Sequence, residues 1–272
     1  MQKTIKNEIV IRGIGVHTGE ESSLIMKPAS PNTGIIFRKD STTIPALIEF
    51  ATPVEFGTAL RCSNTKVRGY EHLLSCLYGL GIDNLICEID GKEAPALDGS
   101  ALPFIKAIEE VGICVQNTEK LVKRIESPIY LTHNDTFIMA LPDEDFRVSY
   151  LLDYGVKYPG IQYINLKIDP ESYKKEIGGA RTYTFMSWID DLRKKGLIKG
   201  GSLNNAIVID ENGPIGSNPL RFADEFVRHK VLDLIGDLAL IGYPIKGHIF
   251  GIKSGHKTNI PFVRKLKDAL GK

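Results

Sequence analysis

The chain has 272 residues, of which 43% are hydrophobic and 25% charged, a composition typical of a globular protein. Its 34 basic and 33 acidic residues leave a formal net charge of +1, which excludes the basic excess expected of a nucleic-acid partner. Four cysteines without a CxxC pair, and a start (MQKTIKNEIV) without a signal pattern, predict reduced thiols in a cytoplasmic protein. Stable membrane insertion is not expected, because every apolar run is shorter than about 18 residues.

Short strands and two helices are predicted in the first part of the chain. One helix begins near residue 70 and ends at Gly79 or Gly81, and the other comprises about residues 102–111 before Gly112. The polar residues 116–120 predict a domain boundary, so residues 1–117 form the first α+β domain. Alternating or apolar runs between turn residues predict strands at residues 8–12, 23–26, 34–37 and 84–89.

The second part, residues 118–272, repeats this pattern as a second α+β domain. A helix is predicted at residues 184–195 before Gly196, and a long helix at residues 224–240. Strands are predicted at residues 121–125, 136–141, 148–153 and 206–209. Each part contains a helix with a histidine near its start, His72 or His229, which suggests a duplication with two α+β halves and facing helices.

A histidine and two carboxylates share one face of the long predicted helix. His229, Asp233 and Asp237 follow one another at intervals of four residues, about one helical turn. Burying them among apolar residues is costly unless something neutralises them, and a divalent metal would do so. Imidazole nitrogen and carboxylate oxygen suit zinc, so His229 and Asp233 are candidate ligands. The alternative is a hydrogen bond or ion pair on the helix surface.

A catalytic zinc usually has three protein ligands, and His72 is the best candidate for the third. It directly follows Glu71, and a carboxylate beside a metal ligand is suited to act as a general base. The HExxH motif is absent, because Cys76 stands four residues after His72. On these residues alone, the favoured interpretation is a carboxylate at a helix N-terminus beside a packed histidine.

Two further histidines lie in glycine-containing segments. His256 is predicted in a loop after an apolar strand, residues 247–252, from which it can reach into a cleft. His17 lies in a glycine-rich segment, residues 13–19, that lacks the lysine and the spacing of a phosphate-binding loop. His133 and His248 have no partner in the sequence and are interpreted as structural.

Nine segments together resemble one known family, the bacterial UDP-3-O-acyl-N-acetylglucosamine deacetylases, zinc enzymes of the committed step of lipid A (lipopolysaccharide) synthesis. The resemblance covers nearly the whole chain, and the block from Arg221 to Asp237 is its most specific part. The segments are Gly13–Gly19, Asn32–Ile35, Glu71–Leu74 with Gly79–Asn84, Asp98–Ala101, Ala180–Tyr183, Gly200–Ser202, Arg221–Asp237 and Lys253–His256.

The resemblance implies a role for each matching residue. Zinc is held by His72, His229 and Asp233, with Fe²⁺ as the alternative metal in the cell. Glu71 is the general base, and a protonated His256, oriented by Asp237, stabilises charge or protonates the leaving amine. Lys230 and Thr182 lie close to the reacting carbonyl or the substrate phosphates, and Tyr154 and His17 are expected to contact the substrate.

The implied reaction is hydrolysis of the N-acetyl group of a UDP-linked acylated amino sugar, giving acetate and a free amine. The implied fold has two similar β/α sandwich halves whose helix layers pack together, with the cleft between them. An insert in the second half, residues 185–201, is expected to form the acyl-chain passage. The candidate lining residues of this passage are Met186, Trp188, Ile189, Leu192, Leu197 and Ile198. The chain is expected to act as a monomer.

Two departures from the family pattern leave alternatives open. Gly69 replaces a threonine two residues before Glu71, and the loop from Tyr154 to Gly160 is longer and lacks a histidine. A related metal amidase acting on another N-acetylated or acylated sugar is therefore one alternative. A sugar-nucleotide-binding protein without activity is another, although a binder does not need Glu71 and His256.

Overall fold

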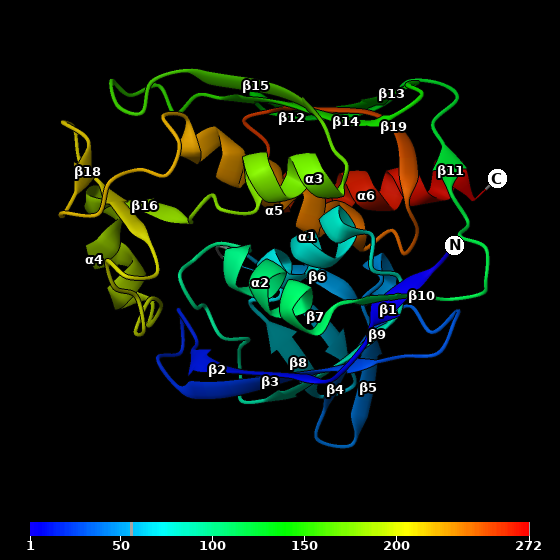
Figure 1. Cartoon of the computed structure of the whole chain (residues 1–272). Helices are drawn as coiled ribbons and strands as arrows, with labels where there is room; N and C mark the ends of the chain where they lie inside the picture. The colour runs from blue at the N-terminus through cyan, green and yellow to red at the C-terminus, as the bar shows by residue number, and fades with distance from the viewer. Residues whose placement is uncertain (55–56, 272) are drawn as a thin grey trace.

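Two β-sheets form the outer layers of the molecule, and helices fill the space between them (Figure 1). The computed structural model describes residues 1–54 and 57–271. In the first sheet β9 and β4 are parallel, and all other neighbours are antiparallel. Its five strands, in spatial order, are β2 (Ile9–Ile14), β3 (Glu21–Pro28), β9 (Leu85–Asp90), β4 (Ile35–Lys39) and β5 (Thr42–Pro45).

The second sheet repeats the same order of strand directions. Its third and fourth strands, β19 and β14, are parallel, and the neighbours on each side are antiparallel. This shared topology confirms the predicted fold of two similar α+β halves, whereas the boundary at residue 117 stays a prediction. The order is β12 (Ile129–His133), β13 (Thr136–Leu141), β19 (Ile245–Ile252), β14 (Phe146–Leu152) and β15 (Gln162–Lys167), with β11 (Lys123–Arg124) beside β19.

The two helix layers meet at the centre of the molecule. Helices α1 (Glu71–Leu80) and α2 (Leu102–Val111) cover the first sheet (Figure 1). The second sheet is covered by α5 (Glu225–Ala239), α6 (His256–Leu270), the short α3 (Pro170–Ser172) and the single π-helical turn η2 (Tyr173–Ile177). Helices α1 and α5 pack on each other, and their leucines belong to one buried hydrophobic cluster. Each fully buried leucine contributes about 2 kcal/mol.

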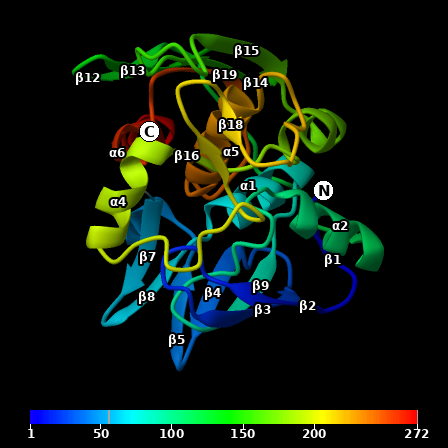
Figure 2. The same ribbon diagram turned by 90° about the vertical axis from the view of Figure 1, so that its left-hand side faces the viewer.

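Smaller elements extend both halves. One group, η1 (Ile48–Phe50), β6 (Ala51–Val54), β7 (Gly57–Cys62) and β8 (Thr65–Arg68), belongs to the first half, and β1 (Lys3–Ile5) pairs with β10 (Ile113–Val115). Another group lies together at the left-hand end of the molecule in Figure 1, the side that faces the viewer in Figure 2: β16 (Tyr183–Phe185), α4 (Met186–Lys194), β17 (Ile207–Ile209) and β18 (Pro214–Ile215).

Two sequence-based predictions of secondary structure were wrong. Residues 184 and 185 form part of strand β16 rather than the start of a helix, because they pair with Val208 and Ile209 of β17. The segment after Gly255 is not a loop but the helix α6, which contains Pro261. Glycine before a segment and proline within it both indicate interruption of a helix, so the pattern concealed α6.

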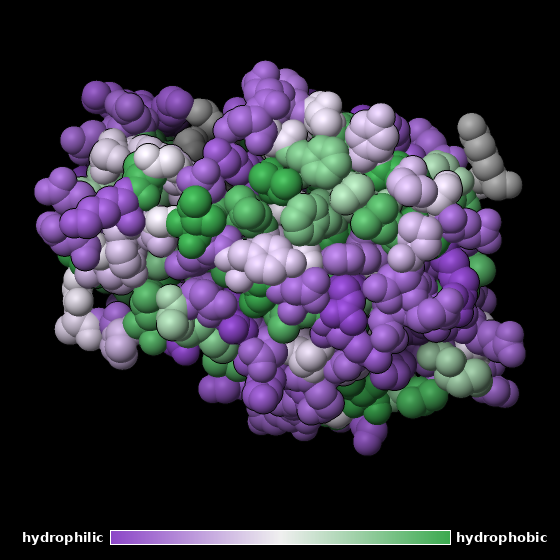
Figure 3. Space-filling model, turned by 90° about the horizontal axis from the view of Figure 1, so that it is seen from above, coloured by the Kyte–Doolittle hydropathy of each residue, from purple (hydrophilic) through white to green (hydrophobic). Residues whose placement is uncertain are grey.

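The outer face of the second sheet carries exposed aromatic residues. Tyr130 is 55% exposed and Tyr163 54%. Figure 3 shows hydrophobic residues gathered near the middle of this face, with hydrophilic ones around them. Within residues 1–54 and 57–271, each helix is too short or too polar to cross a bilayer.

Gly236 of α5 packs directly against the backbone of Glu71 at the start of α1, where the two halves meet. A Cβ atom at Gly236 would lie 2.4 Å from the Glu71 carbonyl oxygen. We therefore expect Gly236→Ala to push the helices apart and to lower the free energy of unfolding by about 1–3 kcal/mol. Denaturant unfolding measures this. Gly179→Ala is the control, because its Cβ would meet only the Phe222 ring at 3.5 Å, an ordinary contact. Equal stability of the two variants would contradict the prediction.

Candidate active site

Three side chains from the two facing helices converge at the interface of the halves. His72 comes from α1, and His229 and Asp233 come from α5. The Nε2 atoms of His72 and His229 lie 3.8 Å and 3.4 Å from Asp233 Oδ1, and the candidate ligand atoms all lie within 4.8 Å of one another. Four-coordinate zinc ligands at about 2.0–2.1 Å from the ion are roughly 3.4 Å apart, so the spacing suits such an ion.

The charge states of these three groups also suit a metal ion. Burial lowers the pKa of His72, and it lowers the pKa of His229 to about 4, so both imidazoles are neutral at pH 7. Burial opposes ionisation of Asp233, but the Lys230 ammonium holds the pKa of this carboxyl well below its usual range. Lys230 Nζ donates to Asp233 Oδ2 at 2.9 Å. Two neutral imidazoles and one carboxylate are a suitable donor set for zinc.

The orientation of the His229 ring is fixed by the backbone. Its Nδ1 lies 3.1 Å from the carbonyl oxygen of Ala180, and a carbonyl oxygen can only accept, so Nδ1 carries the proton. The lone pair is therefore on Nε2, which faces Asp233. This is the usual arrangement of a metal-binding histidine, whose second nitrogen donates to a neighbouring acceptor.

Glu71 lies beside this group as a buried carboxylate with defined partners. Its Oε1 accepts hydrogen bonds from the backbone nitrogen of Thr58 at 2.5 Å and from Thr58 Oγ1 at 2.8 Å. Burial raises the pKa of Glu71, while the positive charge of His256 opposes this rise. A carboxylate with a raised pKa is suited to take a proton near neutral pH. Thr58 was missed by the sequence analysis, because its bond to Glu71 depends on how β7 and α1 pack.

His256 and Asp237 form a second charged pair in the site. His256 is the first residue of α6, and its Nδ1 lies 2.8 Å from Asp237 Oδ2. Asn259, one turn further along α6, also donates to Asp237 Oδ2, at 2.9 Å. Burial disfavours the imidazolium, but the Asp237 carboxylate raises the pKa of His256 to about 9. His256 is therefore positively charged at pH 7.

A cavity of about 270 Å³ opens above these groups. Asp237, another predicted site residue, does not line the cavity but is hydrogen-bonded to His256, which does. Tyr154 packs its ring edge-on against Phe185 and Trp188, and its hydroxyl lies 2.9 Å from that of Tyr183. The predicted residues that line the cavity are His17, Glu71, His72, Tyr154, Thr182, His229, Lys230, Asp233 and His256.

The loop that carries His17 is held by a residue to which the sequence gave no role. The buried Glu93 carboxylate accepts from the backbone nitrogens of His17 and Thr18, each at 3.0 Å. The loop is also joined to the other half, because Lys199 and Gly200 donate to the carbonyl oxygens of His17 and Val16. These contacts connect segments that lie far apart in the sequence, so the spacing of residues along the chain could not predict them.

The residues proposed to line an acyl passage differ in exposure. Trp188 lines the cavity and is 39% exposed, and Met186 is 48% exposed. Leu192 is only 4% exposed and packs as a core residue.

Comparisons with known proteins agree on one family. A family model described as UDP-3-O-acyl N-acetylglycosamine deacetylase (LpxC) matches residues 2–268. A protein of Thermodesulfovibrio yellowstonii named UDP-3-O-acyl-N-acetylglucosamine deacetylase is 45% identical over 267 residues, covering 97% of this chain and 91% of its own. A protein of the same name from Chlamydia pneumoniae is 40% identical over 275 residues, covering 99% of this chain and 98% of its own.

Proposed function

Because the chain belongs to the UDP-3-O-acyl-N-acetylglycosamine deacetylase family, we propose that it hydrolyses the N-acetyl group of UDP-3-O-acyl-N-acetylglucosamine. The products are acetate and UDP-3-O-acyl-glucosamine, and the reaction serves lipid A synthesis. The observation that carries the proposal is the meeting of the His72, His229 and Asp233 donors with Glu71 and His256 around one cavity.

The residues of the site divide the chemistry between them. His72, His229 and Asp233 would hold a zinc ion, which supplies a Lewis acid that activates water and polarises the amide carbonyl. Glu71, held by Thr58, takes a proton from the attacking water. Positively charged His256, held by Asp237, stabilises the developing negative charge and donates a proton to the leaving amine.

The remaining cavity residues would bind the substrate. Thr182 lines the cavity, and its hydroxyl would donate to the oxyanion, while the Lys230 ammonium would neutralise either this oxyanion or a phosphate. The insert with α4 and Trp188 would receive the acyl chain, since an apolar chain needs an apolar contact surface. Tyr154 and His17, which also line the cavity, would contact the sugar nucleotide.

Acetate release from UDP-3-O-acyl-N-acetylglucosamine tests the proposal directly. Release should stop with a chelator and return with added zinc. A zinc-loaded enzyme that releases no acetate would refute the deacetylase assignment. A parallel panel of other N-acetylated sugars tests the related amidase, which would act on one of them in preference.

Thr58→Val is expected to lower kcat about 10-fold with little change in KM, because the variant loses the hydroxyl bond to Glu71 but keeps the shape. Thr58→Ser retains the hydroxyl and should recover most of the rate. Steady-state kinetics at saturating zinc measure both parameters. A Thr58→Val enzyme as fast as wild type would show that the backbone bond alone holds Glu71.

Asp237→Asn is expected to shift the alkaline limb of the pH profile. Activity needs the imidazolium, so in the wild type it falls as pH rises through the His256 pKa of about 9. Without the Asp237 charge this pKa falls, and the limb should move to lower pH by roughly 1–3 units. The measurement is kcat/KM from pH 5 to 10, with Asp145→Asn as control, because Asp145 is a partly exposed carboxylate that pairs with Lys167 away from the cavity. An unmoved limb would exclude His256 as its origin.

A further inference from the structure

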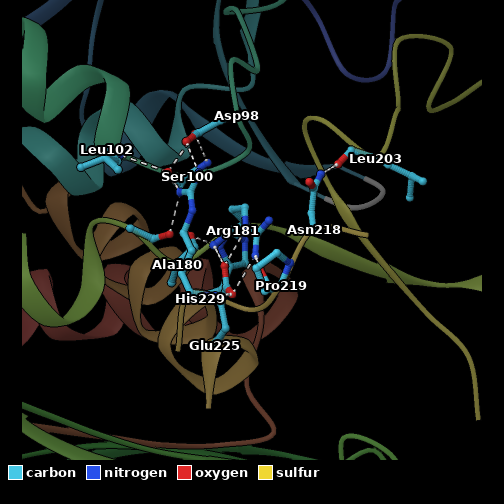
Figure 4. A network of polar contacts seen from close by, with 12 residues as sticks. Asp98, Ser100, Leu102, Ala180, Arg181, Leu203, Asn218, Pro219, Glu225 and His229 are labelled. Carbon is cyan, nitrogen blue, oxygen red and sulfur yellow. Dashed lines mark hydrogen bonds and ion pairs between the residues drawn. The ribbon is translucent and has the colours of Figure 1, made fainter. Parts of the chain in front are cut away.

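A buried polar network surrounds the N-terminus of α5, and His229 is its one labelled member to which the proposed mechanism gives a role (Figure 4). Its centre is Glu225, the first residue of α5, whose side chain is completely buried. Its Oε1 accepts from the backbone nitrogen of Arg181 at 3.0 Å and from Arg181 Nε at 2.8 Å. Its Oε2 accepts from Arg181 Nη2 at 3.1 Å and from the backbone nitrogen of Arg221 at 2.6 Å.

One peptide group in this network is held from both sides. The N–H of Arg181 and the carbonyl of Ala180 belong to the same peptide plane. The N–H donates to Glu225, and the carbonyl accepts from His229 Nδ1. Glu225 and His229 are four residues apart on α5, so two side chains on one face of the helix, one turn apart, hydrogen-bond to this peptide.

From this geometry we propose that Glu225 is a positioning residue for His229, acting through the Ala180–Arg181 peptide. A carboxylate that accepts from the N–H of a peptide polarises that peptide and makes its carbonyl a stronger acceptor. The stronger acceptor holds the proton on His229 Nδ1 and directs Nε2 toward the metal position. In many metal sites a carboxylate contacts the histidine directly, whereas here a peptide lies between them.

Arg221 extends the network to the other half of the molecule. Its Nη2 donates to Asp98 Oδ2 at 2.8 Å, and its Nη1 donates to Ser100 Oγ at 3.2 Å. Nη1 also donates to the carbonyl oxygen of Gly179, in the segment that leads to Ala180. Arg221 therefore links the Asp98–Ser100 loop of the first half to the segment that contains the Ala180–Arg181 peptide.

The competing interpretation is that the ion pair of Glu225 and Arg181 is only structural. Breaking a buried pair destabilises a protein wherever the pair lies, so a loss of stability would not distinguish the two. The kinetic retention of zinc does distinguish them, because it depends on the orientation of His229. Outer contacts of this kind typically change metal affinity by about 10–100-fold.

The experiment measures the rate at which zinc passes from the folded full-length protein to a chromophoric chelator. Glu225→Gln keeps the shape but removes the charge, and zinc loss should be about 10–100-fold faster than in wild type. Arg221→Met, at a partly exposed position, should give a roughly 10-fold increase. Arg228→Gln is the matched control, since Arg228 also lies on α5 but pairs with Asp224 and Glu176. Its zinc should leave at the wild-type rate.

The inference rests on the proposed metal site but needs no substrate, so its failure is separate from that of the proposed function. Thermal unfolding of the metal-free variants identifies effects that come from stability alone. If Glu225→Gln does not fold, Arg221→Met decides. Zinc loss from Glu225→Gln and Arg221→Met at the rate of Arg228→Gln would overturn the proposal. Normal zinc retention in a wild-type protein that releases no acetate would instead overturn the deacetylase assignment.

Discussion

Glu71→Gln is expected to reduce kcat by about 10²–10⁴-fold while the protein keeps its zinc, because general base catalysis contributes a factor of this size. The substitution is nearly isosteric, and the amide oxygen can still accept from Thr58, whose two bonds both go to one oxygen. His72, His229 and Asp233 remain, so the candidate ligand set is unchanged. Only the ability to take a proton is lost.

The measurement combines single-turnover kinetics with metal analysis of the same sample. Glu88→Gln, which changes a partly exposed carboxylate on β9 of the first sheet, should be as fast as wild type. A Glu71→Gln enzyme with full zinc and the wild-type rate would show that another group takes the proton. It would also revive the interpretation of the chain as a binding protein. Loss of zinc together with activity would mean that Glu71 supports the metal rather than the proton transfer.

His229→Ala is expected to abolish zinc retention and to lower kcat/KM to about one-thousandth of wild type or less. The expected loss follows from the several kcal/mol of transition-state stabilisation that a metal ion supplies. The variant also leaves the Ala180 carbonyl without its imidazole partner. Chelated wild-type protein should be equally inactive but should recover with added zinc, whereas His229→Ala should not recover at the same zinc concentration.

His248→Ala is the control for this change. His248 lies on β19 of the second sheet, where its Nε2 is 2.8 Å from Ser149 Oγ. Metal content and rate should therefore be unchanged. If His229→Ala kept one zinc per chain with normal activity, the ligand assignment would be wrong.

The sequence predicted the part of the site that lies on one helix. His229 and Asp233 are four residues apart, and helical periodicity alone puts them on one face. Asp237 is on the same line, but the structure shows it bonded to His256 rather than to the other two. Helical spacing alone could not reveal this bond, because it depends on where α6 begins, and only the family resemblance implied it.

The residue pattern and the spacing along the sequence could not predict contacts between the halves or contacts made by the backbone. His72 joins His229 only because α1 packs on α5, so the residues alone left its role open and the family resemblance supplied it. Thr58 and Glu93 act on segments far away in the chain. The acceptor for His229 is a main-chain carbonyl, which any residue at position 180 would present.

The fold was more predictable than the site, because the two halves repeat one pattern of strands and helices. The sheets were recognised from their alternating strands, although several short strands were missed. Strand pairs such as β16 with β17 are stabilised by tertiary pairing rather than by local preference, so the local pattern of Tyr183–Phe185 was misleading.

The division of the ligands between α1 and α5 has a thermodynamic consequence for the whole chain. An ion held by the proposed ligands, His72 from one half and His229 and Asp233 from the other, would act as a cross-link between the halves. Binding of the ion would then stabilise the association of the two halves by about 2.7 kcal/mol when the free metal concentration is 100 times the dissociation constant. Neither half alone offers all three ligands of this set. Full coordination of the ion would therefore require that the two halves are in contact. If zinc fills this site, its removal should weaken the contact between the halves, and a zinc-sensitive dye would follow that change.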